Sequence, residues 1–314
     1  MIFMANGTQP RQGNAVLQRP GTNSLMVGKP CGQSALCYVN SNRTNRVSRS
    51  FNRSMINDNK LSSVVIGYKD ENYNLLMGSG TLIGPNLVLT SAHVILDIKD
   101  ICAIEGRNYS DTKLFVRFDY EYTSESVDTP SPRLAQFLDE TVIGIKNIGN
   151  VPCKDFALLV LHPSLALPME RVAKIANRSV VQHEDTISFQ HPKVENFEKS
   201  THPDVVTRVS GGEISFNTCH APRDPEHCNA LACVRHTYRY GSSGGGVFDT
   251  NMCLIGVVQG DTGRQDSTAE GQPKCRFVKI ENIIVESKFL KNNVLPGPTW
   301  GKISAFADLS NDNP

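Results

Sequence analysis

The sequence lacks any apolar run long enough to span a membrane. No stretch approaches the roughly 18 consecutive apolar residues of a transmembrane helix, and the apolar start at residues 1–4 is too short for the core of a secretion signal. Acidic residues are absent from the first 57 positions, which hold seven arginine and lysine residues. The absence of a long apolar run and of a secretion signal favours an intracellular protein without a membrane span.

The basic N-terminal arm, residues 1–58, differs in charge from the rest of the chain. The residues after position 57 carry 25 basic and 31 acidic side chains, so the body is mildly acidic although the whole chain has a net charge of +1. We expect a disordered arm. An organelle-targeting peptide and an arm that binds nucleic acid or another acidic partner are the alternatives.

Nine cysteines, an odd number, occur in the 314 residues. A chain of this length can bury a core without a disulfide framework, so mostly reduced thiols are expected. A segment rich in cysteine and histidine precedes residue 240 and contains Cys219, His220, His227, Cys228, Cys233 and His236. Its spacing fits no compact zinc pattern well, so free thiols or a local disulfide are expected ahead of a structural zinc.

Short segments rich in β-branched and apolar residues recur after residue 60, separated by Gly, Pro, Asn and Asp. Such segments are typical of an all-β sandwich or a pair of barrels. Helical spacing of apolar residues is nearly absent before residue 280, where one C-terminal helix is predicted. The expected strands are 63–68, 75–83, 87–90, 113–120, 141–148 and 156–161, then 186–190, 204–209, 213–216, 232–238, 246–248, 253–259 and 276–280.

The two series of strands divide near residues 163–177, a polar segment with two prolines. Each half holds about 110 residues, a common domain size. We therefore predict a first domain at 59–165, a second domain with the C-terminal helix at 166–295, and a polar tail at 296–314.

Residues 240–248 place serine hydroxyls among glycines, just before an apolar strand-like segment. Because glycine lets the backbone approach a reacting carbonyl closely, the N–H groups of Gly241 and Ser243 are candidates for stabilising an oxyanion. A serine nucleophile needs a base nearby and a group that orients the base. Taken alone, the pattern is equally typical of a surface turn between two strands.

Candidates for the base and its orienting group lie upstream. His93 follows a strand-like segment and two small residues, which leave the space around the ring that a general base needs. Asp155 opens the apolar run 156–161, so its carboxylate is expected at a buried strand end, where an imidazole N–H is a natural partner. Each residue alone also fits a structural role, as a satisfied histidine or as an aspartate in a turn.

Three segments together resemble the chymotrypsin-like serine endopeptidases. Residues 90–93 (TSAH), 155–159 (DFALL) and 241–245 (GSSGG) are similar to the TAAH, DIALL and GDSGG segments of that family, and they occur in its order of His, Asp and Ser. The resemblance implies two six-stranded antiparallel β-barrels with a C-terminal α-helix. It also implies hydrolysis of peptide bonds in protein or peptide substrates, without a metal or organic cofactor.

The resemblance assigns a role to each residue. Ser243 would be the nucleophile, His93 the general base and then acid, and Asp155 the residue that holds the imidazole tautomer. Gly241 and Ser243 would supply the oxyanion N–H groups. The alternative is a catalytically silent protease homologue that acts as a binding or scaffold module.

Some positions depart from the secreted members of the family. Ser242 stands where those members have an aspartate that pairs with a freed N-terminus, and Val94 stands where they have a disulfide cysteine. The chain therefore looks more like the non-secreted branches, with an active site that does not wait for cleavage of a precursor.

The substrate pocket follows from the same resemblance. Its residues would be Thr237 at the base and Val258, Gln259 and Gly260 along one wall. Because Thr237 is uncharged, a preference for Arg or Lys before the scissile bond is not supported, although Asp261 could still reach a basic side chain.

Overall fold

The computed structural model of the chain describes the majority of its residues, and the account below refers to them. They are 24–25, 38–40, 51, 53–69, 74–109, 113–119, 122–123, 133–134, 138–148, 154–162, 167–191, 208–216, 230–234, 238, 240–261, 275–293 and 300–301. Strands predominate among them. None of the helices in these ranges combines the length and the apolar character needed to cross a membrane.

The first barrel is a closed ring of six antiparallel strands in the order β10-β5-β4-β3-β6-β9. It is formed by β3 (Ser63–Lys69), β4 (Asn74–Gly84), β5 (Leu87–Thr90), β6 (Lys113–Phe118), β9 (Leu138–Ile148) and β10 (Ala157–Leu161). Two short strands, β7 (Tyr122–Thr123) and β8 (Arg133–Leu134), pair with each other. This ring matches the first series of predicted strands.

The second barrel also closes on itself, because β13, β12, β15, β16, β17 and β14 pair in that order and β14 returns to β13. Its strands are β12 (Asp185–Gln190), β13 (Arg208–Phe216), β14 (Leu231–Val234), β15 (Gly246–Phe248), β16 (Cys253–Asp261) and β17 (Cys275–Lys279). Two six-stranded antiparallel barrels were predicted and are confirmed. The two segments expected at 204–209 and 213–216 contribute to one strand, β13; residues 204–207 lie outside the described ranges.

Four shorter strands extend the second sheet. β11 (Lys174–Ala176) runs parallel to β16 and pairs with β18 (Trp300–Gly301). β1 (Ser24–Leu25) pairs with β2 (Tyr38–Asn40), which runs parallel to β13. Two strands that belong to the predicted N-terminal arm therefore lie at this sheet.

Strands β5 and β10 form the seam between the two barrels. They pair with each other, and alternate side chains point to opposite cores. Val88 and Leu159 lie in the core of the first barrel, whereas Leu89 and Leu158 lie in a core shared with the second barrel. Burial on both faces explains why β10 and the first three residues of β5 are all apolar.

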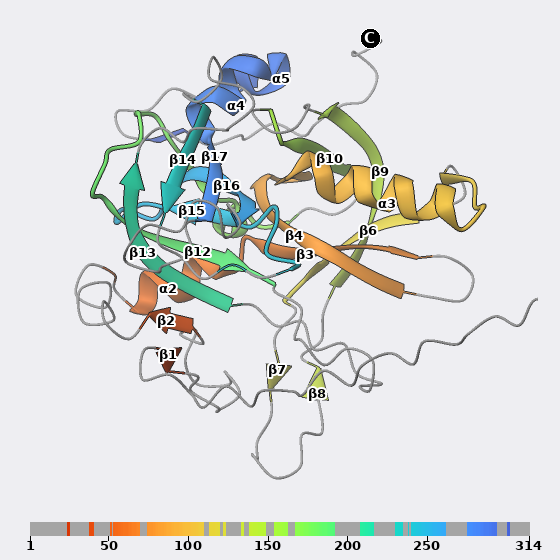
Figure 1. The fold of residues 1–314 in the computed structure, drawn as a ribbon, viewed down its shortest axis with the longest axis horizontal. Coiled ribbons are helices and arrows are strands. Elements are labelled where there is room, and N and C mark those ends of the chain that lie inside the picture. Colours follow the sequence, from red (N-terminus) through yellow and green to blue (C-terminus); the bar gives the residue numbers. More distant parts are fainter. Residues whose placement is uncertain are drawn as a thin grey trace, which may run out of the picture.

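The helices differ more from the sequence-based predictions than the strands do. Helix α3 (Ala92–Ile104), which lies alongside the first barrel (Figure 1), was not predicted. The single helix expected near residue 280 is two, α4 (Ile280–Glu286) and α5 (Lys288–Asn293), because Ser287 separates them and its hydroxyl accepts the Leu290 N–H. A one-turn 3-10 helix, η2 (Met169–Arg171), precedes β11.

Helix α2 (Arg53–Lys60) lies across the boundary at residue 58 that was predicted for the arm. Phe51 and Ile56 are buried in the core shared with the second barrel. The arm therefore ends in residues that pack against the folded body, so the expected disorder does not hold for these residues. The other predicted domain boundaries stay predictions.

Candidate active site

His93 and Asp155 lie just outside strands β5 and β10, at the same end of the seam between the barrels. Thr90, the last residue of β5, pairs with Ala157, the first residue of β10, so the residues just outside the two strands lie together. The Nδ1 of His93 lies 2.7 Å from Oδ2 of Asp155, and the backbone N–H of His93 donates to Oδ1 at 2.9 Å. The Asp155 side chain is fully buried. Two hydrogen bonds from one residue thus offset the cost of burying this carboxylate.

The imidazole of His93 is 26 % exposed, whereas its partner is not exposed at all. Burial lowers the pKa of His93, but the hydrogen bond and charge of Asp155, together with the charge of Asp97, outweigh that effect and raise the pKa above its ordinary value. With Nδ1–H donated to Asp155, Nε2 is the nitrogen left to accept a proton. The pair therefore presents a basic nitrogen of increased proton affinity.

The turn that carries Ser243 depends on two glycines. Gly241 and Gly244 have φ values of 87° and 88°, in the left-handed region that glycine favours. A Cβ atom on Gly244 would lie 2.0 Å from the carbonyl oxygen of Ser79 and 2.2 Å from the hydroxyl of Thr90, so no other residue fits there. Ser243 lies between the two glycines, is partly exposed, and its hydroxyl donates to the carbonyl of Gln259 at 3.3 Å.

Ser79, a buried residue of β4, anchors this turn from the first barrel. Its N–H donates to the carbonyl of Ser243 at 2.8 Å, and its hydroxyl donates to the carbonyl of Gly241 at 2.7 Å. The same hydroxyl accepts the N–H of His191 at 2.7 Å. Ser79 was not among the predicted site residues; the only signal for it is a small polar residue between two glycines in an otherwise apolar strand.

One carbonyl joins the segment before His93 to the turn of Ser243. The carbonyl of Val258 in β16 accepts the N–H of Gly244 at 2.8 Å and the hydroxyl of Ser91 at 2.7 Å. Ser91 is two residues before His93, and Gly244 directly follows Ser243. The fold therefore brings the three predicted residues, which are 62 and 88 positions apart, to one place between the barrels.

The residues predicted for the oxyanion site and the pocket differ in burial and in hydrogen bonding. The N–H groups of Gly241 and Ser243 donate to no acceptor among the described residues. The side chain of Val258 is fully buried in the shared core, and its predicted place in the pocket wall stays a prediction. Gln259 is largely buried and Gly260 is partly exposed, and Thr237 lies outside the described ranges.

His191 is a second histidine of the interface between the barrels, at the end of β12. It is completely buried, and burial lowers its pKa to about 3, although a hydrogen bond with the backbone of Val64 opposes this effect. The imidazole is therefore neutral at physiological pH.

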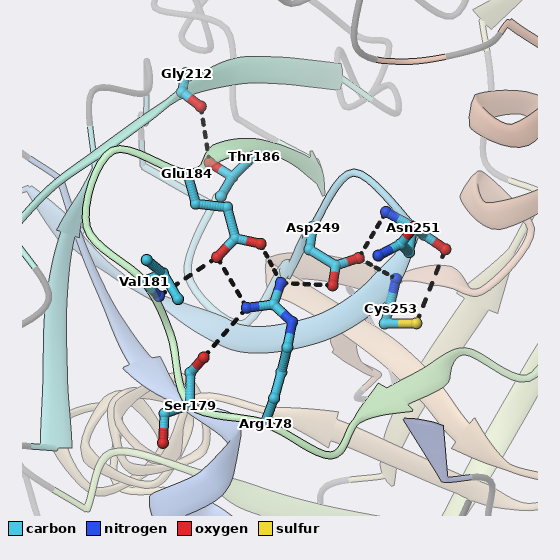
Figure 2. A network of polar contacts seen from close by, with 9 residues as sticks. All are labelled: Arg178, Ser179, Val181, Glu184, Thr186, Gly212, Asp249, Asn251 and Cys253. Carbon is cyan, nitrogen blue, oxygen red and sulfur yellow. Dashed lines mark hydrogen bonds and ion pairs between the residues drawn. The ribbon is translucent and has the colours of Figure 1, made fainter. Parts of the chain in front are cut away.

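A second polar cluster lies at the other end of β15 (Figure 2). The guanidinium of Arg178 forms ion pairs with Glu184 and with Asp249, the latter at 2.7 Å. Asp249 is buried and also accepts the backbone N–H groups of Asn251 and Cys253, at 2.9 and 2.8 Å. The cluster fixes the turn between β15 and β16, and hydrogen bonds to both carboxylates raise the pKa of Arg178.

The described cysteines are mostly reduced. Cys102, Cys253 and Cys275 are buried thiols, whereas Cys233 is disulfide-bonded. Burial and the charge of Asp249 raise the pKa of Cys253 to about 11, so its thiol is not a nucleophile at neutral pH. The rest of the segment rich in cysteine and histidine lies outside the described ranges. Within those ranges, no three His, Cys, Asp or Glu side chains gather as a metal site would require.

One protein-family model matches the sequence of this chain. The sequence model of the trypsin-like peptidase domain matches residues 78–257, which is more than half of the chain. The chain belongs to the trypsin-like peptidase family. The matched region begins in β4 and ends in β16, so it contains His93, Asp155 and Ser243 in the order typical of these peptidases.

Several solved structures of peptidases are similar to this trypsin-like chain. Deg5 is 13 % identical, with a TM-score of 0.47, over 74 % of this chain and 90 % of Deg5. The active form of the Rv3671c protease from M. tuberculosis is 18 % identical, with a TM-score of 0.45, over 74 % and 84 % of the two chains. The apo MamO protease domain from Magnetospirillum magneticum is 14 % identical, with a TM-score of 0.45, over 73 % and 97 %. No curated protein matches the sequence.

Proposed function

We propose that the protein is a serine endopeptidase that hydrolyses peptide bonds through an acyl-enzyme. The observation that carries this proposal is the 2.7 Å contact between His93 Nδ1 and the buried carboxylate of Asp155, next to a glycine-rich turn that presents Ser243. A titratable base oriented by a buried acid beside a serine is the arrangement that activates a weak hydroxyl nucleophile. In domain terms, residues 59–165 supply the base and acid, and residues 166–295 supply the nucleophile.

The chemical steps follow from these roles. The Ser243 hydroxyl attacks the substrate carbonyl while its proton passes to Nε2 of His93, and the C–N bond then breaks as the imidazolium gives that proton to the leaving amine. Water, deprotonated by His93, hydrolyses the ester and restores the serine. Asp155 holds Nδ1–H throughout and stabilises the imidazolium, which agrees with the raised pKa of His93.

The backbone of the turn supports the charged intermediate. The N–H groups of Gly241 and Ser243, which have no acceptor among the described residues, would donate to the oxyanion. Before attack, the Ser243 hydroxyl must rotate away from the carbonyl of Gln259. Since that hydrogen bond is 3.3 Å long, it is weak and opposes the rotation little.

The same hydrogen bond is the observation that favours the second candidate, a catalytically silent homologue that binds polypeptides. In the resting structure the hydroxyl of Ser243 donates to Gln259, not to the base. If that state persisted in solution, the serine would not be activated and the cleft could only bind.

A fluorophosphonate probe separates the two candidates, because it reacts covalently with activated serines. We expect the probe to label the wild type and not Ser243→Ala. Ser242→Ala is the matched control: it removes the neighbouring buried hydroxyl and should keep the labelling. Equal labelling of the Ser243→Ala variant would refute the assignment of the nucleophile, and no labelling of folded wild type would favour the silent homologue.

A further inference from the structure

Helix α3 begins beside the proposed base and presents one exposed face to the solvent. His93, Asp97, Asp100 and Ile104 are three or four positions apart, so they share a face of the helix. Asp97 and Asp100 are exposed, and Ile104 is 84 % exposed. The opposite face packs into the first barrel through Val94, Ile95, Ile98 and Cys102. Two carboxylates thus follow the base along a face that is open to a ligand.

These two carboxylates have no cationic partner in the described part of the chain. No lysine or arginine there forms an ion pair with Asp97 or Asp100. Lys99, between them in sequence, lies instead over the ring of Tyr109, 5.1 Å from its centroid. Asp155 adds a further negative charge, and the imidazole that it contacts is neutral before it accepts a proton. The surroundings of His93 therefore carry a net negative charge.

Tyr240 contributes an exposed aromatic ring at the same place. It directly precedes Gly241, and its side chain is 62 % exposed. The first turn of α3 lies close to the Ser243 turn, because a Cβ atom on Gly78 would meet Val94 at 2.7 Å and the carbonyl of Ser243 at 3.2 Å. After burial, the charge of Asp97 is the largest cause that raises the pKa of Tyr240. The same charge also raises the pKa of His93, and Asp97 lies one turn after His93 on the exposed face of α3.

We propose that Asp97 and Tyr240 are specificity-determining residues that select a lysine or arginine side chain in the substrate, just after the scissile bond. An exposed carboxylate one turn after the base and an exposed ring directly before Gly241 can attract a cation in two ways, through charge and through the electron-rich face of the ring. This inference rests on the proposed endopeptidase activity.

The position relative to the scissile bond follows from the proposed chemistry. The acyl half of the substrate stays bonded to Ser243, whose hydroxyl lies beside Gln259 on β16. The amine half leaves with the proton of His93. Because Asp97 is one helical turn beyond His93, it lies next to the half that leaves.

The expected preference is moderate, because the groups are exposed. An exposed ion pair and an exposed cation–π contact together give a preference of about three- to thirty-fold over a neutral side chain. A digest of a complex peptide library, followed by mass spectrometry of the products, measures residue frequencies on both sides of every cleaved bond. We expect Lys and Arg to be enriched at the first two positions after the cleaved bond.

Matched variants make the test specific. Asp97→Asn and Tyr240→Ala should each reduce the enrichment, while cleavage of neutral sequences continues. Tyr240→Phe keeps the ring and should keep the enrichment. Asp100→Asn removes the same charge from the same helix face, one turn further from His93, and should change the enrichment least.

The outcomes separate this inference from the proposed activity. If the wild type cleaves the library without enrichment after the bond, or if Asp97→Asn and Asp100→Asn behave alike, the inference is wrong while the endopeptidase stands. Enrichment before the bond that disappears in Asp97→Asn would also overturn the placement. If the wild type and the Ser243→Ala variant give the same cleavage products, the endopeptidase proposal fails and this inference fails with it.

Discussion

Two aspartates, Asp155 and Asp249, are buried almost completely in the same protein and differ in what balances their charge. Asp155 accepts a backbone N–H and the imidazole N–H of His93. Asp249 accepts two backbone N–H groups and pairs with the guanidinium of Arg178, which is also held by Glu184. Both arrangements satisfy the carboxylate, but only the first uses a partner that can gain and lose a proton near neutral pH.

The partner decides what a buried acid can do. Arginine keeps its charge at all physiological pH values, so the cluster around Asp249 can hold a turn and cannot transfer a proton. The imidazole beside Asp155 is 26 % exposed and has a second nitrogen that does not contact the carboxylate. The comparison therefore predicts that changes at Asp155 affect the reaction, whereas changes at Asp249 affect the stability of the fold.

The largest expected effect is at Asp155. Asparagine keeps the shape of the side chain, but it no longer holds the imidazole in the required tautomer or stabilises its charged form, so kcat should fall about 10⁴-fold. Steady-state hydrolysis of a peptide that the wild type cleaves measures the change. Asp249→Asn is the control and should stay within about tenfold of the wild type. A similar loss in both variants would remove the distinction between the two acids.

At Asp249 the expected loss is in stability. Asp249→Ala leaves the N–H groups of Asn251 and Cys253 without their acceptor and removes one partner of Arg178, which should lower the free energy of unfolding by about 2–4 kcal/mol. Urea unfolding followed by circular dichroism measures it. Asp249→Asn keeps an oxygen acceptor and should lose less. An unchanged unfolding midpoint in Asp249→Ala would show that the cluster does not stabilise the turn.

His191 extends the comparison to a buried group that stays neutral. Its folded pKa is about 3, whereas the unfolded chain takes up a proton below the ordinary value of 6.5, so its contribution to stability is lost as pH falls through that interval. Between pH 7.5 and 5, the free energy of unfolding should fall by about 2 kcal/mol more in the wild type than in His191→Gln. Denaturant titrations at both pH values measure the difference; parallel losses in the two proteins would contradict a buried neutral imidazole.

The smallest expected effect tests how far the base is tuned by a neighbour. The charge of Asp97 raises the pKa of His93, so Asp97→Asn should lower it. Because the base must be neutral to accept a proton, the acid limb of kcat/KM for an uncharged substrate should move to lower pH. Asp100→Asn should move the limb less. A shift to higher pH in Asp97→Asn would mean that its charge does not act on the imidazole.

The barrels were predictable because their strands have strong local patterns. β10 and the first three residues of β5 are all apolar, a consequence of burial on both faces at the seam. The three candidate residues were predicted from short segments in the right order, and their roles stay predictions. Their common location depends on the pairing of Thr90 with Ala157 and on the carbonyl of Val258, which no local pattern contains.

Helix α3 was missed although its sequence carries a helical signal. Val94, Ile95, Ile98 and Cys102 are spaced as one buried helix face, but Val94, Ile95 and Ile98 are β-branched, and such side chains lower the helix propensity of the segment. The contacts of Arg178 with Asp249 and of Ser79 with Gly241 join residues 71 and 162 positions apart. Contacts of that separation depend on the packing of the barrels and leave no periodic trace in the sequence.

The hydrogen bonds of Ser79 also set an order of events in the making of the protein. Ser79 belongs to β4, whereas the turn that it anchors at Gly241 and Ser243 belongs to the other barrel. Contacts between positions so far apart require the closure of a long loop, which slows folding. We therefore expect a half-made chain, or either barrel alone, to lack the anchored turn, so that the proposed capacity to cut other proteins would arise only after both barrels have been made and joined.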